Sequence, residues 1–250
     1  MKLALLSDLH ANLQALQACL ADARARGATH HAFLGDLVGY GADPGPVLDL
    51  VMAHAAQGAW VLGGNHDAVA VQPPAGVPQR ADQAGAAWTH AQLSPAQRGF
   101  LAGLPLVIRE GEILMVHASA DAPARWAYVD TPLSATASLA AAQAAGARWV
   151  FGGHVHEQRL FYDGAGGRVM AFEPTPGVAI PVPGHRRWLA TVGSVGQPRD
   201  GRPQAMYALF DGEAQRLRFL RVEYDVAAAA QAIRRAGRPE ADAARLARGR

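Results

Sequence analysis

Five short segments of this 250-residue chain carry side chains that can bind metal ions, and each follows a short apolar stretch. Carboxylates, imidazoles and one carboxamide therefore gather where strands are predicted to end, which is how α/β proteins build metal and catalytic sites. A single Asp-x-His pair would mean little, but five such strand ends in one chain indicate a shared site. The segments are Asp8-Leu9-His10, Gly35-Asp36, Gly64-Asn65-His66-Asp67, Val116-His117 and Gly153-His154-Val155-His156.

The spacing within two of these segments favours joint ligation of one ion. Residues two apart on a strand face the same side, so Asp8 and His10 can approach an ion together, and His154 and His156 repeat the arrangement. The glycines that precede several of the ligands should let the backbone turn sharply. Oxygen and imidazole ligands without thiolate suit Mn, Fe, Zn, Ni or Co better than a soft metal.

Charge favours two divalent ions rather than one. Asp8, Asp36 and a bound hydroxide would neutralise only part of the charge of two such ions, and the remainder would attract a phosphate. A pair about 3.5–4 Å apart could share Asp36 and the hydroxide while holding the attacking and non-bridging oxygens. Water bound to such ions ionises near neutral pH.

The elements that must position these residues alternate between strand and helix in the first third of the chain. This order predicts parallel strands joined by right-handed crossovers, and the strand-rich second half predicts two sheets packed face to face with helices outside. Residues 70–105 read as helix and loop. The expected strands are 2–7, 31–35, 59–62, 106–109, 113–117, 148–151, a hairpin of 158–162 and 168–172, 187–192, 204–210 and 215–223; the expected helices lie near 11–26, 44–56, 132–145 and 226–236.

Composition indicates a soluble globular protein. Half of the residues are apolar and 18% are charged, and no apolar run approaches the roughly 20 residues that span a bilayer. The chain begins directly with a strand that carries site residues, which argues against a cleaved leader. The single cysteine, Cys19, cannot form an intrachain disulfide and falls in a helical pattern, so we expect it to be buried and the protein to be cytoplasmic.

Basic charge is concentrated at the C-terminus. Residues 234–250 hold six arginines against Glu240 and Asp242, which leaves 17 basic and 19 acidic residues in the rest of the chain. We expect a partly frayed, solvated tail there, with contact to a polyanion as the less favoured interpretation. The predicted organisation is a single domain over 1–225, followed by a C-terminal helix and an Arg-rich tail over 226–250.

The order of the five segments resembles that of the calcineurin-like metallophosphoesterases. Longer stretches resemble the small bacterial and archaeal phosphodiesterase branch of that superfamily, and the resemblance runs from residue 1 to about 224. It implies a four-layer α/β/β/α sandwich of two packed mixed sheets. The stretches are 7–13 (SDLHANL), 35–41 (GDLVGYG), Trp88-Thr89 with Gln92-Leu93-Ser94, and 193–200 (GSVGQPRD).

The resemblance also implies a role for each ligand. Asp8, His10, Asp36 and His156 would hold one ion, whereas Asp36, Asn65, His117 and His154 would hold the other. His66 would stand off the metals near the leaving-group oxygen as a general acid, and Asp67 could orient it. Members usually begin Asp-x-His-Gly, so Ala11 is a small departure that bears on the loop at the first metal.

The loops around the site bear on the substrate. Protein phosphatases of this superfamily carry arginines after the Gly-Asp and before the Gly-Asn-His motifs, and neither corresponding stretch contains one here. Less positive charge fits a diester, so we expect a phosphodiesterase acting on small nucleotide-like phosphate esters, with Tyr40 and Arg199 as candidate substrate contacts. A phosphomonoesterase or a diadenosine-tetraphosphate-type hydrolase is the alternative; a nuclease or a non-catalytic scaffold is less favoured.

The expected cofactors are two divalent ions. Mn²⁺ is the first choice, with Fe, Zn, Ni, Co or Mg as alternatives. The expected partner is a small-molecule phosphate ester, not a membrane and not, by preference, a nucleic acid. The sequence leaves the oligomeric state open.

Overall fold

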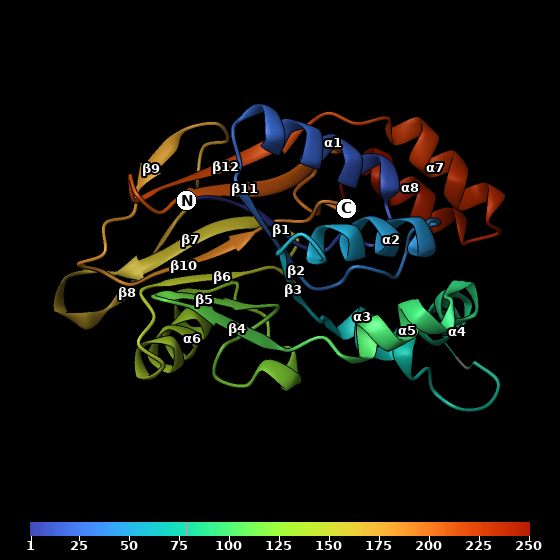
Figure 1. Ribbon diagram of the computed structural model, residues 1–250, viewed down its shortest axis with the longest axis horizontal. Coiled ribbons are helices and arrows are strands. Elements are labelled where there is room, and N and C mark those ends of the chain that lie inside the picture. The colour runs from blue at the N-terminus through green and yellow to red at the C-terminus, as the bar shows by residue number, and fades with distance from the viewer. Residues whose placement is uncertain (79) are drawn as a thin grey trace.

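Two six-stranded mixed sheets pack face to face in the computed structural model, which describes residues 1–78 and 80–250 (Figure 1). The first sheet has the order β3 (Trp60–Leu62), β2 (His30–Leu34), β1 (Lys2–Leu6), β11 (Ala205–Asp211), β12 (Arg216–Val222) and β9 (Ala179–Pro181). The second has the order β4 (Val107–Glu110), β5 (Ile113–Val116), β6 (Trp149–Gly152), β10 (Trp188–Val192), β7 (Gln158–Asp163) and β8 (Val169–Phe172).

Helices cover the outer faces of both sheets, which completes the expected four-layer α/β/β/α sandwich. On the side of the first sheet lie α1 (Leu13–Ala25) and α2 (Pro44–Ala55), and α6 (Pro132–Ala144) covers the second sheet. A helical group beside the sandwich consists of α3 (Asn65–Val71), α4 (Ala81–Gln92) and α5 (Pro95–Ala102). The chain ends in α7 (Val226–Arg235), which packs against α1, and α8 (Glu240–Arg248). Short 3₁₀ turns occupy Pro123–Arg125 and Ala165–Gly167.

Alternation along β1 explains the double-sided core. Leu3 and Leu5 point into the layer between the sheets, whereas Ala4 and Leu6 point toward α1 and α2. Aromatic rings fill the layer between the sheets, where Phe151 and Phe210 lie 5.1 Å apart. Full burial of each such side chain contributes about 1.5–3 kcal/mol to stability. The sheets are therefore held by an apolar layer that leaves their strand ends free for polar side chains.

The strands that precede the five segments end at one edge of the sandwich. β1, β2 and β3 are parallel neighbours in one sheet, and β5, β6 and β10 are parallel neighbours in the other. Their carboxyl ends meet because the two sheets are stacked: the backbone amide of His154, after β6, donates to Asp8 Oδ2, after β1 of the other sheet. The fold thus supplies the convergence that the strand-end pattern predicts.

Most of the expected elements agree with the structure within a residue or two. In the 70–105 region, Ser94 caps α5 by accepting from the amide of Gln97, and Pro95 lies in its first turn. The expectation of a frayed tail is wrong: residues 240–248 form α8, whose apolar side chains Ala243 and Leu246 are buried against α7. The sequence interpretation also missed β9 and the start of α3 at Asn65.

None of the helices in the described part of the chain is long and apolar enough to cross a membrane.

Candidate metal centre

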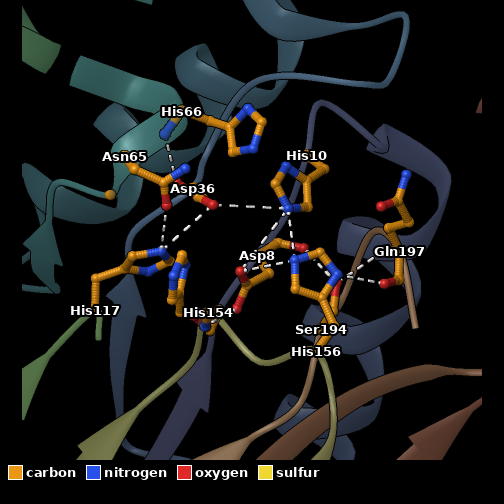
Figure 2. Close-up of polar contacts among 12 residues, drawn as sticks. Asp8, His10, Asp36, Asn65, His66, His117, His154, His156, Ser194 and Gln197 are labelled. Atoms are coloured by element: carbon orange, nitrogen blue, oxygen red, sulfur yellow. Dashed lines mark hydrogen bonds and ion pairs between the residues drawn. The ribbon is translucent and has the colours of Figure 1, made fainter. Parts of the chain in front are cut away.

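Two groups of candidate ligand atoms lie at the strand ends and share one carboxylate (Figure 2). Within each group the ligand atoms lie within 4.8 Å of one another. Asn65 lies beside the group that contains His117, because its Oδ1 is 3.2 Å from His117 Nε2. The first group is Asp8, His10, Asp36 and His156, and the second is Asp36, His117 and His154.

A backbone carbonyl holds each of the four imidazoles by one ring nitrogen. His10 Nδ1 donates to Val38 O at 3.1 Å, and His156 Nδ1 donates to Gln197 O at 2.6 Å. A carbonyl only accepts, so the bonded nitrogen carries a proton and the other nitrogen points toward the cluster. The other two pairs are His117 Nδ1 with Leu34 O at 2.7 Å and His154 Nε2 with Trp126 O at 2.9 Å.

The free atoms of the first group fit a cation. The Nε2 atoms of His10 and His156 face each other at 3.0 Å, close enough for one ion to bind both once both nitrogens are deprotonated. Asp8 Oδ1 is buried and has no hydrogen-bond partner in the described part of the chain, although it lies 3.1 Å from His156 Nε2. A buried carboxylate oxygen without a partner is costly, and metal coordination removes that cost.

Electrostatics within the cluster keep the carboxylates charged. Burial, the largest single influence, raises the pKa of Asp8, but His156 and His117 together lower it. The pKa of Asp36 is likewise held well below its usual range, against burial, mainly by His117. Burial and the adjacent His156 push the pKa of His10 well below its ordinary value, so this ring is neutral at pH 7. These are the protonation states that metal ligation requires; against burial, Asp36 raises the pKa of His117 to about 10, so an ion bound there would displace a proton from that ring.

Left-handed backbone conformations are concentrated at this site. Nine residues other than glycine have positive φ in the described part of the chain, and eight of them are ligands or neighbours of ligands; Gln215 is the exception. Such conformations cost about 1–3 kcal/mol each and persist only where the surrounding structure enforces them. The eight are Asp8, His10, Ala11, Asp36, Tyr40, Trp126, His154 and His156.

The glycines before the ligands serve two purposes rather than one. Gly35 has φ +88°, as the predicted sharp turn requires. Gly64 and Gly153 have no positive φ, and their need for glycine comes from close approach: a Cβ on Gly64 would collide with Asp36, and one on Gly153 would collide with Ser7 and Asp8.

His66 lies beside the ligand groups without joining them. Its backbone amide donates to Asp36 Oδ1 at 2.8 Å, while its ring stands edge-on to His10 with centroids 5.0 Å apart. Figure 2 shows the ring above the two groups with no contact drawn to it. Burial lowers the pKa of His66, and the Asp36 carboxylate acts in the opposite direction.

The expected contact between Asp67 and the ring of His66 is replaced by a different one. Asp67 Oδ1 accepts from the amides of Leu37 and Val38 at 2.9 and 3.1 Å, and Oδ2 accepts from Gly64 at 2.9 Å. The side chain therefore ties the loop after β2 to the turn that begins α3. Burial and the nearby Asp36 raise the pKa of Asp67 to about 7.

Comparison with known proteins assigns the family. The model of the calcineurin-like phosphoesterase superfamily domain matches residues 1–215. The chain belongs to this superfamily. A metallophosphoesterase from Sphaerobacter thermophilus has a similar structure, with a TM-score of 0.88 and 34% identity over 100% of this chain and 99% of its own.

Two archaeal proteins are also similar to this phosphoesterase. An uncharacterized protein, MJ0912, of Methanocaldococcus jannaschii is 31% identical over 95% of this chain and 94% of its own length. The hypothetical protein PH1004 of Pyrococcus horikoshii OT3 shares the fold with a TM-score of 0.75 at 20% identity, over 100% of this chain and 98% of its own. The expectation of a calcineurin-like phosphoric ester hydrolase with clustered metal-binding side chains is confirmed at this level.

Tyr40 and Arg199 lie together on one wall of the site of this phosphoesterase. The Tyr40 ring is 4.8 Å from the His10 ring and 4.6 Å from the His66 ring, measured between centroids. The Arg199 guanidinium lies 6.0 Å from the Tyr40 centroid, and its Nη2 donates to Gln197 Oε1 at 3.1 Å. Gln197 is the residue whose carbonyl holds His156, so this wall is continuous with the first ligand group.

Two aromatic residues beside the second ligand group escaped the sequence interpretation. The Tyr128 ring stacks on the His154 ring with centroids 4.3 Å apart and an interplanar angle of 18°, and 51% of Tyr128 is exposed. Trp126, whose carbonyl holds His154, has φ +53° and places its ring 5.8 Å from that of His117. The segment has no metal-ligand pattern, so only the unusual density of aromatic residues in Trp126-Ala127-Tyr128 could have indicated it.

Proposed function

We propose that this phosphoesterase is a dinuclear metal-dependent phosphodiesterase that acts on small nucleotide-like substrates. The observation that carries the proposal is the pair of ligand groups that share Asp36. A backbone carbonyl holds each imidazole by one nitrogen and leaves the second nitrogen facing its group. An arrangement of this kind suits two divalent ions that together bind one phosphate group.

The proposed metal ligands divide as the two groups do. One ion would be held by Asp8, His10, Asp36 and His156, and the other by Asp36, Asn65, His117 and His154. When bound, such ions supply charge neutralisation for the phosphate and lower the pKa of water to near neutrality. We propose Mn²⁺ as the first candidate, because oxygen and imidazole ligands suit it.

We propose that His66 delivers a proton to the leaving-group oxygen. Its ring is near both ligand groups, stands free of them, and is confined by Tyr40 on one side and His10 on another. Gly39 leaves room for this ring, since a Cβ there would lie 2.7 Å from His66 Nδ1. Asp67 supports this role by fixing the turn at Gly64 rather than by touching the ring.

The absence of arginine from two loops of the site supports a preference for a diester. The 35–41 loop and the Gly63-Gly64 turn contain no arginine, and Arg199 contacts Tyr40 and Gln197. A diester carries one negative charge on its phosphate where a monoester carries close to two, so fewer cationic side chains are needed. The exposed face of Tyr128 suits a nucleobase, because bases stack on aromatic rings with about 1–3 kcal/mol per base.

The proposal is tested by ranking substrates with added Mn²⁺. Release of p-nitrophenol from the bis(p-nitrophenyl) diester should exceed release from the p-nitrophenyl monoester. The opposite ranking would remove the diester assignment and favour a phosphomonoesterase. We also propose that the protein acts in the cytoplasm, on the strength of its single buried cysteine.

A further inference from the structure

An arginine of the supposed tail is buried against the wall of the site. We use the name C-terminal hairpin for residues 226–250, which comprise α7, α8 and the turn between them. The side chain of Arg238, in that turn, is only 7% exposed. Burial of an arginine is unfavourable unless its donors find partners, so its contacts require an explanation.

The Arg238 guanidinium joins three parts of the molecule. It lies over the Trp88 ring of α4, 4.8 Å from the centroid, and Nη2 lies 3.5 Å from Asp242 Oδ2 of α8. Nε and Nη2 both point to the carbonyl oxygen of Tyr40 at 3.4 Å. Gly85 of α4 gives the guanidinium room, because a Cβ there would lie 3.3 Å from Nη2.

The end of the hairpin holds the other residue of the same wall. The amide of Gly201 donates to the carbonyl of Gly249 at 2.8 Å, which fixes the loop that follows Arg199. Gly249 lies so close to Arg202 that a Cβ would collide with its backbone. The C-terminal hairpin therefore contacts both loops that carry the proposed substrate contacts.

Tyr40 needs support of this kind. It has φ +59°, a conformation that a tyrosine adopts only when held there. Its ring packs against His10 and His66, so a change in its backbone would move a neighbour of both a ligand and the proposed acid. Arg238 contacts the backbone carbonyl of Tyr40, so this contact restrains the strained backbone directly.

We propose that the C-terminal hairpin is a working part of the catalytic centre and that Arg238 is a positioning residue that holds the Tyr40 backbone. Arginine suits this position because its planar group can stack on Trp88 while forking toward one oxygen, which a lysine cannot do. The kinetic part of this inference rests on the proposed function. The structural part concerns the Tyr40 loop alone and does not depend on turnover.

Hydrogen exchange tests the structural part. Arg238→Met keeps the apolar stem and removes the donors, and the exposed Arg248→Met on α8 is the matched control. Amides of residues 38–43 should exchange roughly tenfold faster in Arg238→Met, as expected for the loss of a charge-assisted hydrogen bond, and at the wild-type rate in Arg248→Met. Arg238→Lys should restore only part of the protection. Unchanged exchange in Arg238→Met would overturn the inference.

A double-mutant cycle with Tyr40→Ala tests the kinetic part. Arg238→Met should lower kcat/KM for the diester roughly tenfold with metal content unchanged. In the Tyr40→Ala background, the same substitution should lower kcat/KM by less than about twofold. An equal loss in both backgrounds would mean that Arg238 does not act through Tyr40, and would overturn its positioning role. If no phosphate ester is hydrolysed while exchange still rises in Arg238→Met, the proposed function fails and the structural inference stands.

Discussion

The ligand cluster and the wall that carries Tyr40 are held in place by different parts of the chain. Carbonyls at the end of β2 and in the loops around the site hold the imidazoles, such as Leu34 O for His117 and Val38 O for His10. The Tyr40 carbonyl is held by Arg238, 198 residues away in the sequence and outside the range that the family model matches. The candidate ligand cluster is thus held by the sandwich and its loops, whereas the wall that carries Tyr40 contacts a peripheral helical hairpin.

This difference teaches that the two properties can change independently. A substitution in the cluster disturbs buried, charged groups at the ends of both sheets. A substitution at Arg238 in the C-terminal hairpin acts through the Tyr40 carbonyl and touches no candidate ligand side chain. Variants in each region should therefore separate metal content from substrate affinity.

The largest effect is expected for the shared carboxylate. Asp36→Asn removes the one charge common to both ligand groups, so turnover should fall by more than about 10⁴-fold and bound metal should decrease in both positions. Elemental analysis and steady-state kinetics measure these changes. Asp211→Asn, at the opposite end of the first sheet, is the control and should behave as wild type. Retention of full metal content in Asp36→Asn would contradict the shared-ligand arrangement.

His66→Ala should come next and should depend on the leaving group. A general acid contributes roughly 10²–10⁴-fold, so the loss should reach that range for an alkyl diester. It should be smaller for the p-nitrophenyl diester, whose leaving group departs without a proton. Metal content should match that of wild type and of the exposed control His185→Ala. Equal losses with both leaving groups would show that His66 does not deliver the proton.

Asp67→Asn should affect stability more than substrate affinity. One side-chain oxygen would become an NH₂ group facing a backbone N–H, which leaves buried groups unpaired at a cost of about 1–3 kcal/mol. For a domain of this size Tm should fall by roughly 2–4 °C per kcal/mol. Thermal unfolding followed by circular dichroism measures this shift. An unchanged Tm with an altered KM would instead place Asp67 in substrate binding.

Tyr128→Ala should produce a smaller effect confined to affinity. Loss of a stacking ring should raise KM roughly tenfold for a diester that carries a nucleobase, with little change in kcat. Tyr128→Phe, which keeps the ring, should preserve KM. Dimethyl phosphate, which has no base, should inhibit wild type and Tyr128→Ala equally. A KM that responds equally to the phenylalanine and alanine variants would exclude stacking.

The reactivity of the Cys19 thiol is expected to change least and serves as a control for the other variants. It is fully buried in α1, and burial raises the pKa of its thiol, so it should not react with an aromatic disulfide reagent in the native protein. It should react once the chain is unfolded. Reaction in native Arg238→Met would show that this variant loosens the core as well as the loop.

The sequence determined the candidate ligands and the class of fold, because both depend on short-range patterns. Apolar strands that end in Asp8, Asp36 and His117 specify what must meet once parallel strands share an edge. The predicted strands and helices follow from the same alternation of buried and exposed positions. The family match confirms the class that these patterns indicate.

Only the tertiary structure decided which groups support the ligands and the substrate wall. The partner of Asp67 depends on how the turn at Gly64 meets the loop after β2, and the stacking of Tyr128 on His154 depends on a loop without any motif. Prediction and structure disagree most clearly at the Arg-rich C-terminus. Its charge pattern predicts a solvated tail, whereas Arg238 is buried against α4 and the Tyr40 loop. Contacts between residues so far apart leave no periodic signal in a sequence, since they follow from how separate elements pack.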